Sequence, residues 1–210
     1  MASASDLQRV PIRGVLIFTS LYMLLAVVGA ITQRNAEFVY YIVVMVILIA
    51  VVGLIHFRTP MTRGLLWGFS LWGLSHMAGG LTPLPAGWPY HGEHAVLYSW
   101  WIILENLKYD QVVHAYGFGL TTVLCWHLLR SGLRRHEGVE LRPTFGILTL
   151  CAAAGTGFGA LNEVIEFVAV LTMPETNVGG YRNTGWDLVA NLVGAALAVI
   201  LIRFRAKSTG

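Results

Sequence analysis

An apolar run from Phe38 to Ile55, FVYYIVVMVILIAVVGLI, constrains the fold of this chain more than any other feature. Its length matches the hydrocarbon core of a bilayer, because roughly 20 apolar residues span that core as a helix. The chain of 210 residues is 56% hydrophobic and only 12% charged, whereas an ordinary soluble domain is about 25% charged. The run and the composition together predict a protein that crosses a membrane.

Five further apolar segments repeat this pattern, so we expect an all-α bundle of six transmembrane helices that forms one integral membrane domain over residues 1–210. The expected spans cover residues 15–31, 38–56, 65–77, 112–129, 145–172 and 188–202. The connection between the third and fourth spans, residues 79–109, is long and begins GGLTPLPAGWPYHGEH. Because Gly and Pro exclude one continuous helix here, we expect a loop that caps the bundle. Its second part, AVLYSWWIILEN, suits a short strand or an interfacial helix.

Basic residues predict the orientation of the bundle. If the N-terminus lies in the cytoplasm, cytoplasmic segments hold all of the 14 Lys and Arg residues except Arg34, Lys108 and Arg182. Membrane proteins carry such an excess of positive charge on the cytoplasmic side, so we expect both termini there and the long loop outside. This asymmetry accounts for the net charge of +3. The charge therefore indicates contact with the lipid bilayer and gives no support for binding of nucleic acid.

Ionisable residues of the expected spans gather at their outer ends. Asp110 and His114 open the fourth span, Glu163 and Glu166 lie late in the fifth, and Asp187 opens the sixth. Residues three, four or seven positions apart share one face of a helix, so each set forms a stripe. Because small residues let membrane helices approach closely, we expect the three faces to meet. Each stripe continues into glycine, at Gly117, at Gly155 and Gly159, and at Gly194.

Four carboxylates within or immediately before these spans need a counter-charge. A charged side chain costs about 2.5–3.5 kcal/mol at the centre of a membrane helix, and the expected spans contain no Lys or Arg. The counter-charge could be a metal ion, protons on the carboxyl groups or a cationic substrate. Carboxylates and imidazole are ligands for Zn²⁺, Fe²⁺ and Mn²⁺, and helix bundles hold metals between facing ligand pairs. We therefore expect a divalent metal held by Asp110, His114, Glu163, Glu166 and Asp187, with His76 as a sixth ligand.

Three functions are compatible with this site. The first is a metal-dependent hydrolase of a lipid or envelope substrate, in which Glu166 is the general base. The second is a transporter or proton-coupled protein that uses the acids as a relay. The third is an accessory subunit with a partner in a membrane complex, where partly protonated acids form a network that fixes the bundle. His91 and His94 of the long loop could cap the site or lie in solvent.

Four motifs give the chain a resemblance to a known family. They are HMAGG at residues 76–80, YDQVVH at 109–114, NEVIE at 162–166 and WDLVAN at 186–191. In this order they resemble the DUF2238 family, the YjdF-like proteins of bacterial inner membranes. Asn162 departs from the Tyr that relatives tend to have there. The resemblance implies a six-helix, multi-pass protein of the inner membrane and singles out the same acids, but it implies no activity. The helix that opens at Asp187 gives a more distant resemblance to VanZ-like proteins.

Overall fold

Six long helices make up most of the chain in a computed structural model that describes residues 12–174 and 176–208. A 3₁₀ turn, η2 (Leu97–Ser99), and an antiparallel pair of short strands, β1 (Trp101–Ile103) and β2 (Leu107–Lys108), lie between the third and fourth helices. The expected helical architecture is therefore confirmed, and the second part of the long loop contains a short strand. The helices are α1 (Arg13–Thr32), α2 (Ala36–Arg58), α3 (Arg63–Leu81), α4 (Tyr109–His136), α5 (Phe145–Thr172) and α6 (Tyr181–Ser208).

Five of these helices, all except α3, are long and apolar enough to cross a membrane. The expected fifth span coincides with α5, whereas α4 and α6 extend beyond the expected spans at both ends. Helix α3 has the length but is less apolar, because Ser70, Ser75 and His76 interrupt its hydrophobic sequence. The six-span arrangement therefore stays a prediction.

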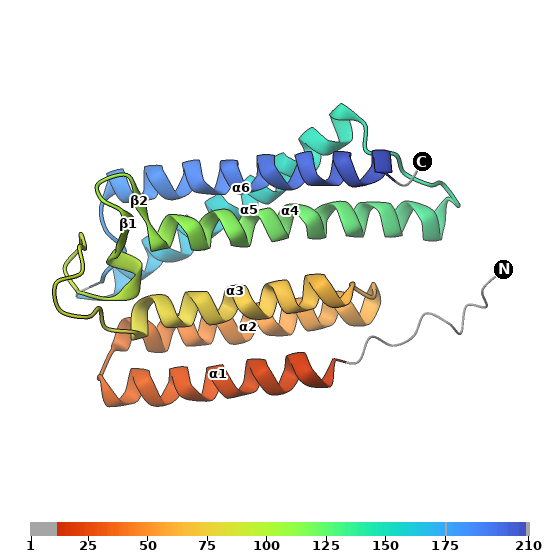
Figure 1. Cartoon of the computed structure of the whole chain (residues 1–210). Helices are drawn as coiled ribbons and strands as arrows, with labels where there is room; N and C mark the ends of the chain where they lie inside the picture. Colours follow the sequence, from red (N-terminus) through yellow and green to blue (C-terminus); the bar gives the residue numbers. More distant parts are fainter. Residues whose placement is uncertain (1–11, 175, 209–210) are drawn as a thin grey trace.

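The helices form two layers, with α1, α2 and α3 in one and α4, α5 and α6 in the other (Figure 1). Consecutive helices run in opposite directions, so α4 and α6 begin at the end where α5 finishes. We call this the loop end, because it carries residues 33–35, 82–108, 173–174 and 176–180. The opposite end is the basic end. The most extensive helix contact joins α4 to α6, α5 packs on both, and α3 joins the layers by packing on α4.

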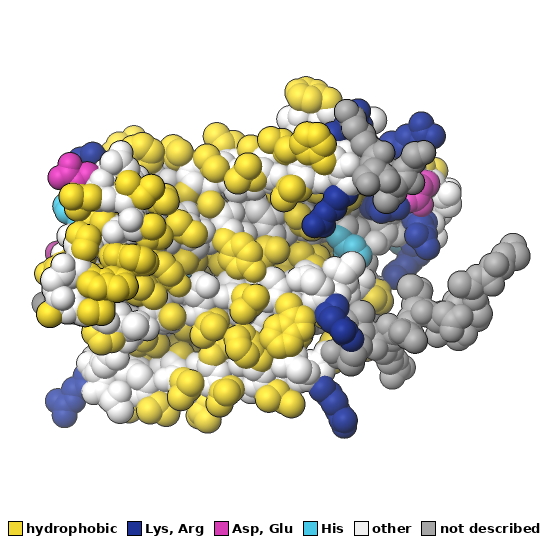
Figure 2. All heavy atoms as spheres, viewed as in Figure 1, with side chains coloured by type: hydrophobic (Ala, Val, Ile, Leu, Met, Phe, Trp, Pro, Cys, Tyr) yellow, Lys and Arg dark blue, Asp and Glu magenta, His cyan; other side chains and the backbone are white. Residues whose placement is uncertain are grey.

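Apolar side chains cover the flanks of the bundle, and Lys and Arg gather at the basic end (Figure 2). Leu24, Val43, Phe167 and Leu201, from four different helices, are all exposed. Exposed apolar flanks with charge confined to the ends are the surface that a bilayer requires. The surface thus agrees with membrane localisation. The arginines at the ends of helices or in connections of the basic end include Arg13, Arg58, Arg63, Arg130, Arg142 and Arg203.

Glycine brings the predicted faces of α4, α5 and α6 together. A Cβ atom at Gly194 would overlap the backbone carbonyl oxygen of Ala115, and one at Gly159 would lie 2.6 Å from Asn191 Nδ2. Helices can approach this closely only where the side chain is a hydrogen atom. The expectation that the three striped faces meet is confirmed, and their contact places the polar residues of each stripe against one another.

Candidate functional site

An imidazole from α4 lies at the centre of the polar residues at the loop end. His114 is 5% exposed, and its Nε2 atom is 3.6 Å from Asp110 Oδ1. The same nitrogen is 3.8 Å from Glu166 Oε1, and Nδ1 is 3.6 Å from Glu163 Oε1. One histidine therefore faces three carboxylates, from its own helix and from α5.

Helix α6 contributes two side chains that are completely buried, Asp187 and Asn191. His114 Nδ1 is 3.1 Å from Asn191 Oδ1. Because an amide oxygen can only accept, Nδ1 carries the proton in this hydrogen bond. In the neutral imidazole, Nε2 then keeps its lone pair and faces Asp110 and Glu166, which is the arrangement that a metal-binding histidine needs.

The carboxylates are only partly satisfied by hydrogen bonds. Asn162 Nδ2 donates to Glu166 Oε1 over 2.7 Å, and Asn183 Nδ2 donates to Asp187 Oδ2 over 2.6 Å. Both oxygens of Glu163 and the Oδ1 atom of Asp187 are buried without a hydrogen-bond partner, and so is the Nδ2 donor of Asn191. A buried acceptor without a partner costs about 1–3 kcal/mol, so these oxygens require a proton or a cation.

The same residues form two groups whose potential ligand atoms lie within 4.8 Å of one another. One group is Asp110, His114 and Asp187, and the other is His114, Glu163 and Glu166. We call the five residues together the acid–histidine cluster. Their donor atoms suit a divalent transition metal, and the unpartnered oxygens fit such an ion. The structure thus brings together five of the six residues expected from the sequence.

Lys108 is the only Lys or Arg that is buried in the described parts of the chain. Its Nζ atom donates to Asn183 Oδ1, and Asn183 in turn donates to Asp187. This chain of hydrogen bonds brings one positive charge toward four carboxylates, so most of the negative charge still needs a counter-charge. Neither Lys108 nor Asn183 was expected at the site, because a lysine before a helix and an asparagine near a helix start have no distinctive spacing.

His76, the sixth expected ligand, lies on α3 and belongs to neither ligand group. Its Nδ1 atom is hydrogen-bonded to the hydroxyl group of Tyr98, a residue of η2. Burial raises the pKa of the Tyr98 phenol well above its ordinary value, and the charges of Asp110 and Glu166 raise it further. Tyr98 therefore stays protonated, and the tautomer of His76 determines which of the two side chains donates in this hydrogen bond. Sequence reasoning missed Tyr98, whose only signal was its position in an aromatic segment of the long loop.

Two cavities reach the cluster from the loop end. A cavity of about 500 Å³ is lined by Asp110, Glu166, His76 and Glu37, among others. A larger one is lined by Asp110 together with Lys108 and residues at the start of α6. Glu166 is thus accessible through the smaller cavity, and Asp110 through both. Glu163, His114 and Asp187 line neither of these two cavities.

The two histidines of the long loop lie at these cavities and not in the cluster. His91 lines the larger cavity and His94 the smaller one, and both residues are exposed. Within the described residues, no hydrogen bond or ion pair joins either side chain to the acids. The long loop therefore surrounds the approach to the cluster without adding a ligand to it.

The fold and the site define a polytopic helical membrane protein with a buried group of carboxylates around one histidine. Residues 14–208 match the family model described as a predicted membrane protein, DUF2238, and the chain belongs to this family. The match confirms the resemblance inferred from the four motifs. The more distant resemblance to VanZ-like proteins has no support in it. No curated protein and no solved structure matches the chain.

Proposed function

We propose that this protein holds a divalent cation, Zn²⁺, Fe²⁺ or Mn²⁺, in the acid–histidine cluster and hydrolyses a lipid or envelope substrate at the outer face of a bacterial inner membrane. One observation carries the proposal. Four carboxylates gather around one imidazole, and none of them forms an ion pair with Lys or Arg in the described residues. A divalent cation would neutralise part of this charge and satisfy the unpartnered oxygens of Glu163 and Asp187.

His114 is the natural centre of the metal site, because it belongs to both ligand groups. The carboxylates of the two groups, Asp110, Asp187, Glu163 and Glu166, would supply the remaining ligands. When bound, the metal would activate a water molecule as a nucleophile for hydrolysis. His76 would then support the site through Tyr98, at the wall of the smaller cavity.

Glu166 is the residue we assign as general base. It lines the smaller cavity, so a water molecule in that cavity can reach it. Its Oε1 atom is held by Asn162, which leaves Oε2 as the oxygen that can accept a proton. A general base must lie within hydrogen-bond reach of the group from which it takes a proton, and Glu166 is the only glutamate of the cluster that lines this cavity.

Close helix packing favours an enzyme over a transmembrane relay. On the side of the cluster toward the basic end, Gly194 lies directly against the carbonyl group of Ala115, and Gly155 lies against Thr122. A relay needs a continuous path of polar groups or water across the membrane, whereas α4, α5 and α6 pack closely against one another immediately beyond the acids. The distribution of Lys and Arg supports an orientation with the open side outside the cell.

The variant Glu166→Gln tests the catalytic assignment. We expect it to lose about 10²–10⁴-fold in hydrolysis rate, because general-base catalysis contributes that much. It should retain bound metal, because Asp110, His114, Glu163 and Asp187 remain as ligands. The measurement is release of product from a panel of phosphoester and carboxylester lipids in detergent micelles, with metal content determined on the same sample. Glu140→Gln is the control, since Glu140 is exposed at the basic end and pairs with Arg130.

Two other results would favour one of the alternative functions, a relay or a structural network. If the wild-type protein hydrolyses nothing but takes up cations or protons into proteoliposomes, and Glu166→Gln abolishes that flux, the acids form a relay. If alanine at several cluster positions only lowers the melting temperature, and neither activity exists, the cluster is a structural network of an accessory subunit.

A further inference from the structure

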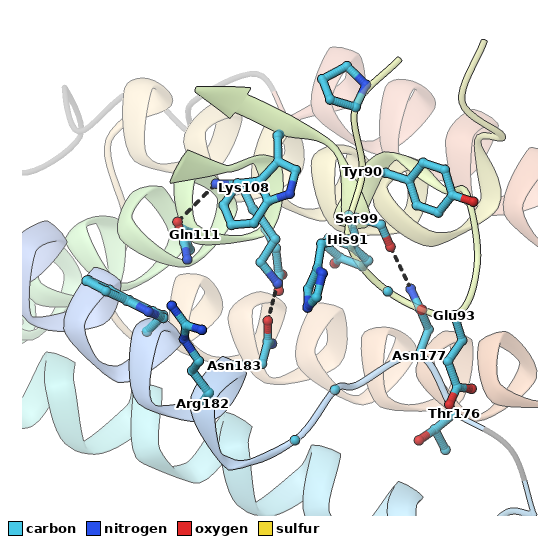
Figure 3. Close-up of a pocket in the computed structure, with 18 of the residues that line it drawn as sticks. Tyr90, His91, Glu93, Ser99, Lys108, Gln111, Thr176, Asn177, Arg182 and Asn183 are labelled. Carbon is cyan, nitrogen blue, oxygen red and sulfur yellow. Dashed lines mark hydrogen bonds between the residues drawn. The ribbon is translucent and has the colours of Figure 1, made fainter. Parts of the chain in front are cut away.

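A cavity of about 1330 Å³ lies at the loop end, where α4 and α6 begin. Its walls come from residues 89–93, the β1–β2 pair and the segment before α6, at residues 173, 174, 176, 177, 179 and 180 (Figure 3). We call it the vestibule. It is larger than the roughly 300–1,000 Å³ of common small-molecule sites, and Asp110 joins it to the acid–histidine cluster. A bare metal ion does not need this volume, so the vestibule has room for a substrate.

Two cations line the vestibule without a direct ion pair to a carboxylate. Lys108 is only 9% exposed, and its Nζ atom donates one hydrogen bond, to Asn183. An ammonium group has three donors, so others remain for a ligand. Arg182, in the first turn of α6, is exposed. Among the described residues, neither side chain forms an ion pair, although four carboxylates lie close by.

The starts of two helices add to this positive region. Both α4, from Tyr109, and α6, from Tyr181, begin at the vestibule. The N-terminus of a helix carries a partial positive charge of about half an elementary charge. Several of the first N–H groups are already bonded here, since Tyr109 N donates to Trp100 O and Asn183 N donates to Gly180 O. Together with the ammonium of Lys108 and the guanidinium of Arg182, these partial charges favour an anion in the vestibule.

Two of the three carboxylates that line the vestibule lie apart from these cations, whereas the third, Asp110, lies two residues from Lys108 at the boundary with the cluster. Glu93 and Glu105 line the cavity and are both exposed to solvent. Figure 3 shows Glu93 beside Thr176 and Asn177, whereas Lys108, Asn183 and Arg182 lie together on the other side. The side of the vestibule with Lys108 and Arg182 is also the side where Gln111 of α4 lies, one residue from Asp110.

We infer that the vestibule binds a phosphate-like oxyanion through Lys108 and Arg182, beside the acid–histidine cluster. Arginine binds phosphate oxygens in pairs, lysine binds them as a point charge, and helix N-termini add a partial positive charge. The inference rests on the proposed function, because it takes the phosphate group to be part of the substrate that the enzyme hydrolyses. The vestibule would orient that substrate by binding this group. That group can belong to a lipid head group or to a soluble molecule, and the chemistry of recognition is the same.

Calorimetric titration of the purified full-length protein in detergent tests this inference. Inorganic phosphate and short-chain phosphatidic acid are separate probes. We expect Arg182→Gln to weaken binding about tenfold and Lys108→Gln to weaken it more, because Lys108 is desolvated and its bond to phosphate is charge-assisted. Lys108→Arg retains the charge and should recover most of the affinity. Arg34→Gln is the matched control, since Arg34 also lies at the loop end but lines only the smaller cavity.

Each outcome decides the question. Binding of both probes supports a site for the phosphate group itself, and binding of phosphatidic acid alone supports a lipid source. Absence of binding by the wild-type protein, or equal weakening by Arg182→Gln and Arg34→Gln, overturns the inference. Metal content of the same samples separates it from the proposed function. If the protein contains no metal but binds phosphate through Arg182, the metalloenzyme proposal is wrong and the phosphate site in the vestibule is supported. If the protein contains metal but binds neither probe, the phosphate site is wrong and the metal site is supported.

Discussion

A single methyl group at Gly194 should destabilise the protein by about 3 kcal/mol, at the upper end of the cost of overpacking. The added Cβ atom would overlap the carbonyl oxygen of Ala115, and it would lie 2.9 Å from the Cα atom of the same residue. A backbone carbonyl within a helix cannot rotate away as a side chain can, so α4 and α6 must move apart. These two helices share the most extensive contact in the bundle and carry Asp110, His114 and Asp187.

Thermal unfolding of Gly194→Ala in detergent, followed by circular dichroism, measures this effect. The control is Gly185→Ala, on the same helix, where an added Cβ atom meets nothing within 4 Å. Alanine has a higher helix propensity than glycine, so this control should be neutral or stabilising by up to about 1 kcal/mol. Equal melting temperatures for the two variants would show that α4 and α6 do not pack as closely as described.

Replacement of His114 by alanine should lower metal affinity at least about 100-fold, because His114 belongs to both groups of potential ligands and contributes the only imidazole to either. Loss of one strong ligand from a site of this kind removes coordination energy and also leaves the remaining carboxylates facing one another. The variant His114→Ala should therefore also respond less than the wild type when metal is added during thermal unfolding.

Competition with a metal-binding dye measures the affinities of the two forms. The matched control is His127→Ala, which removes a histidine from the same helix near the basic end, where His127 Nε2 contacts the carbonyl oxygen of Pro60. We expect the control to bind metal as the wild type does. If His114→Ala remains folded and binds metal with unchanged affinity, the imidazole is no ligand and the assignment is wrong.

Much of the site could be predicted from the sequence, because membrane helices obey a simple periodicity and buried charge is costly. The spacing of Asp110 and His114, and of Glu163 and Glu166, places each pair on one helical face. The glycines that follow identify the face that another helix approaches. These two rules suffice to predict that α4, α5 and α6 meet around the acids.

The rest depends on tertiary contacts that have no local signal. The hydrogen bond between Tyr98 and His76 forms only because η2 packs against the end of α3. The link from Lys108 through Asn183 to Asp187 joins residues 75 positions apart. Segments rich in Gly and Pro admit many conformations, so the sequence of the long loop predicts its presence but neither its path nor the two cavities that it borders.

Metal content of the purified protein tests the central claim most directly. Inductively coupled plasma mass spectrometry on wild-type protein, prepared without chelators, should find about one divalent transition metal ion per chain. The variant Asp187→Asn keeps the shape of a completely buried side chain but removes its charge, and it should retain much less metal. Wild-type protein that contains no metal, gains none on addition of Zn²⁺, Fe²⁺ or Mn²⁺, and is fully stable would contradict the account.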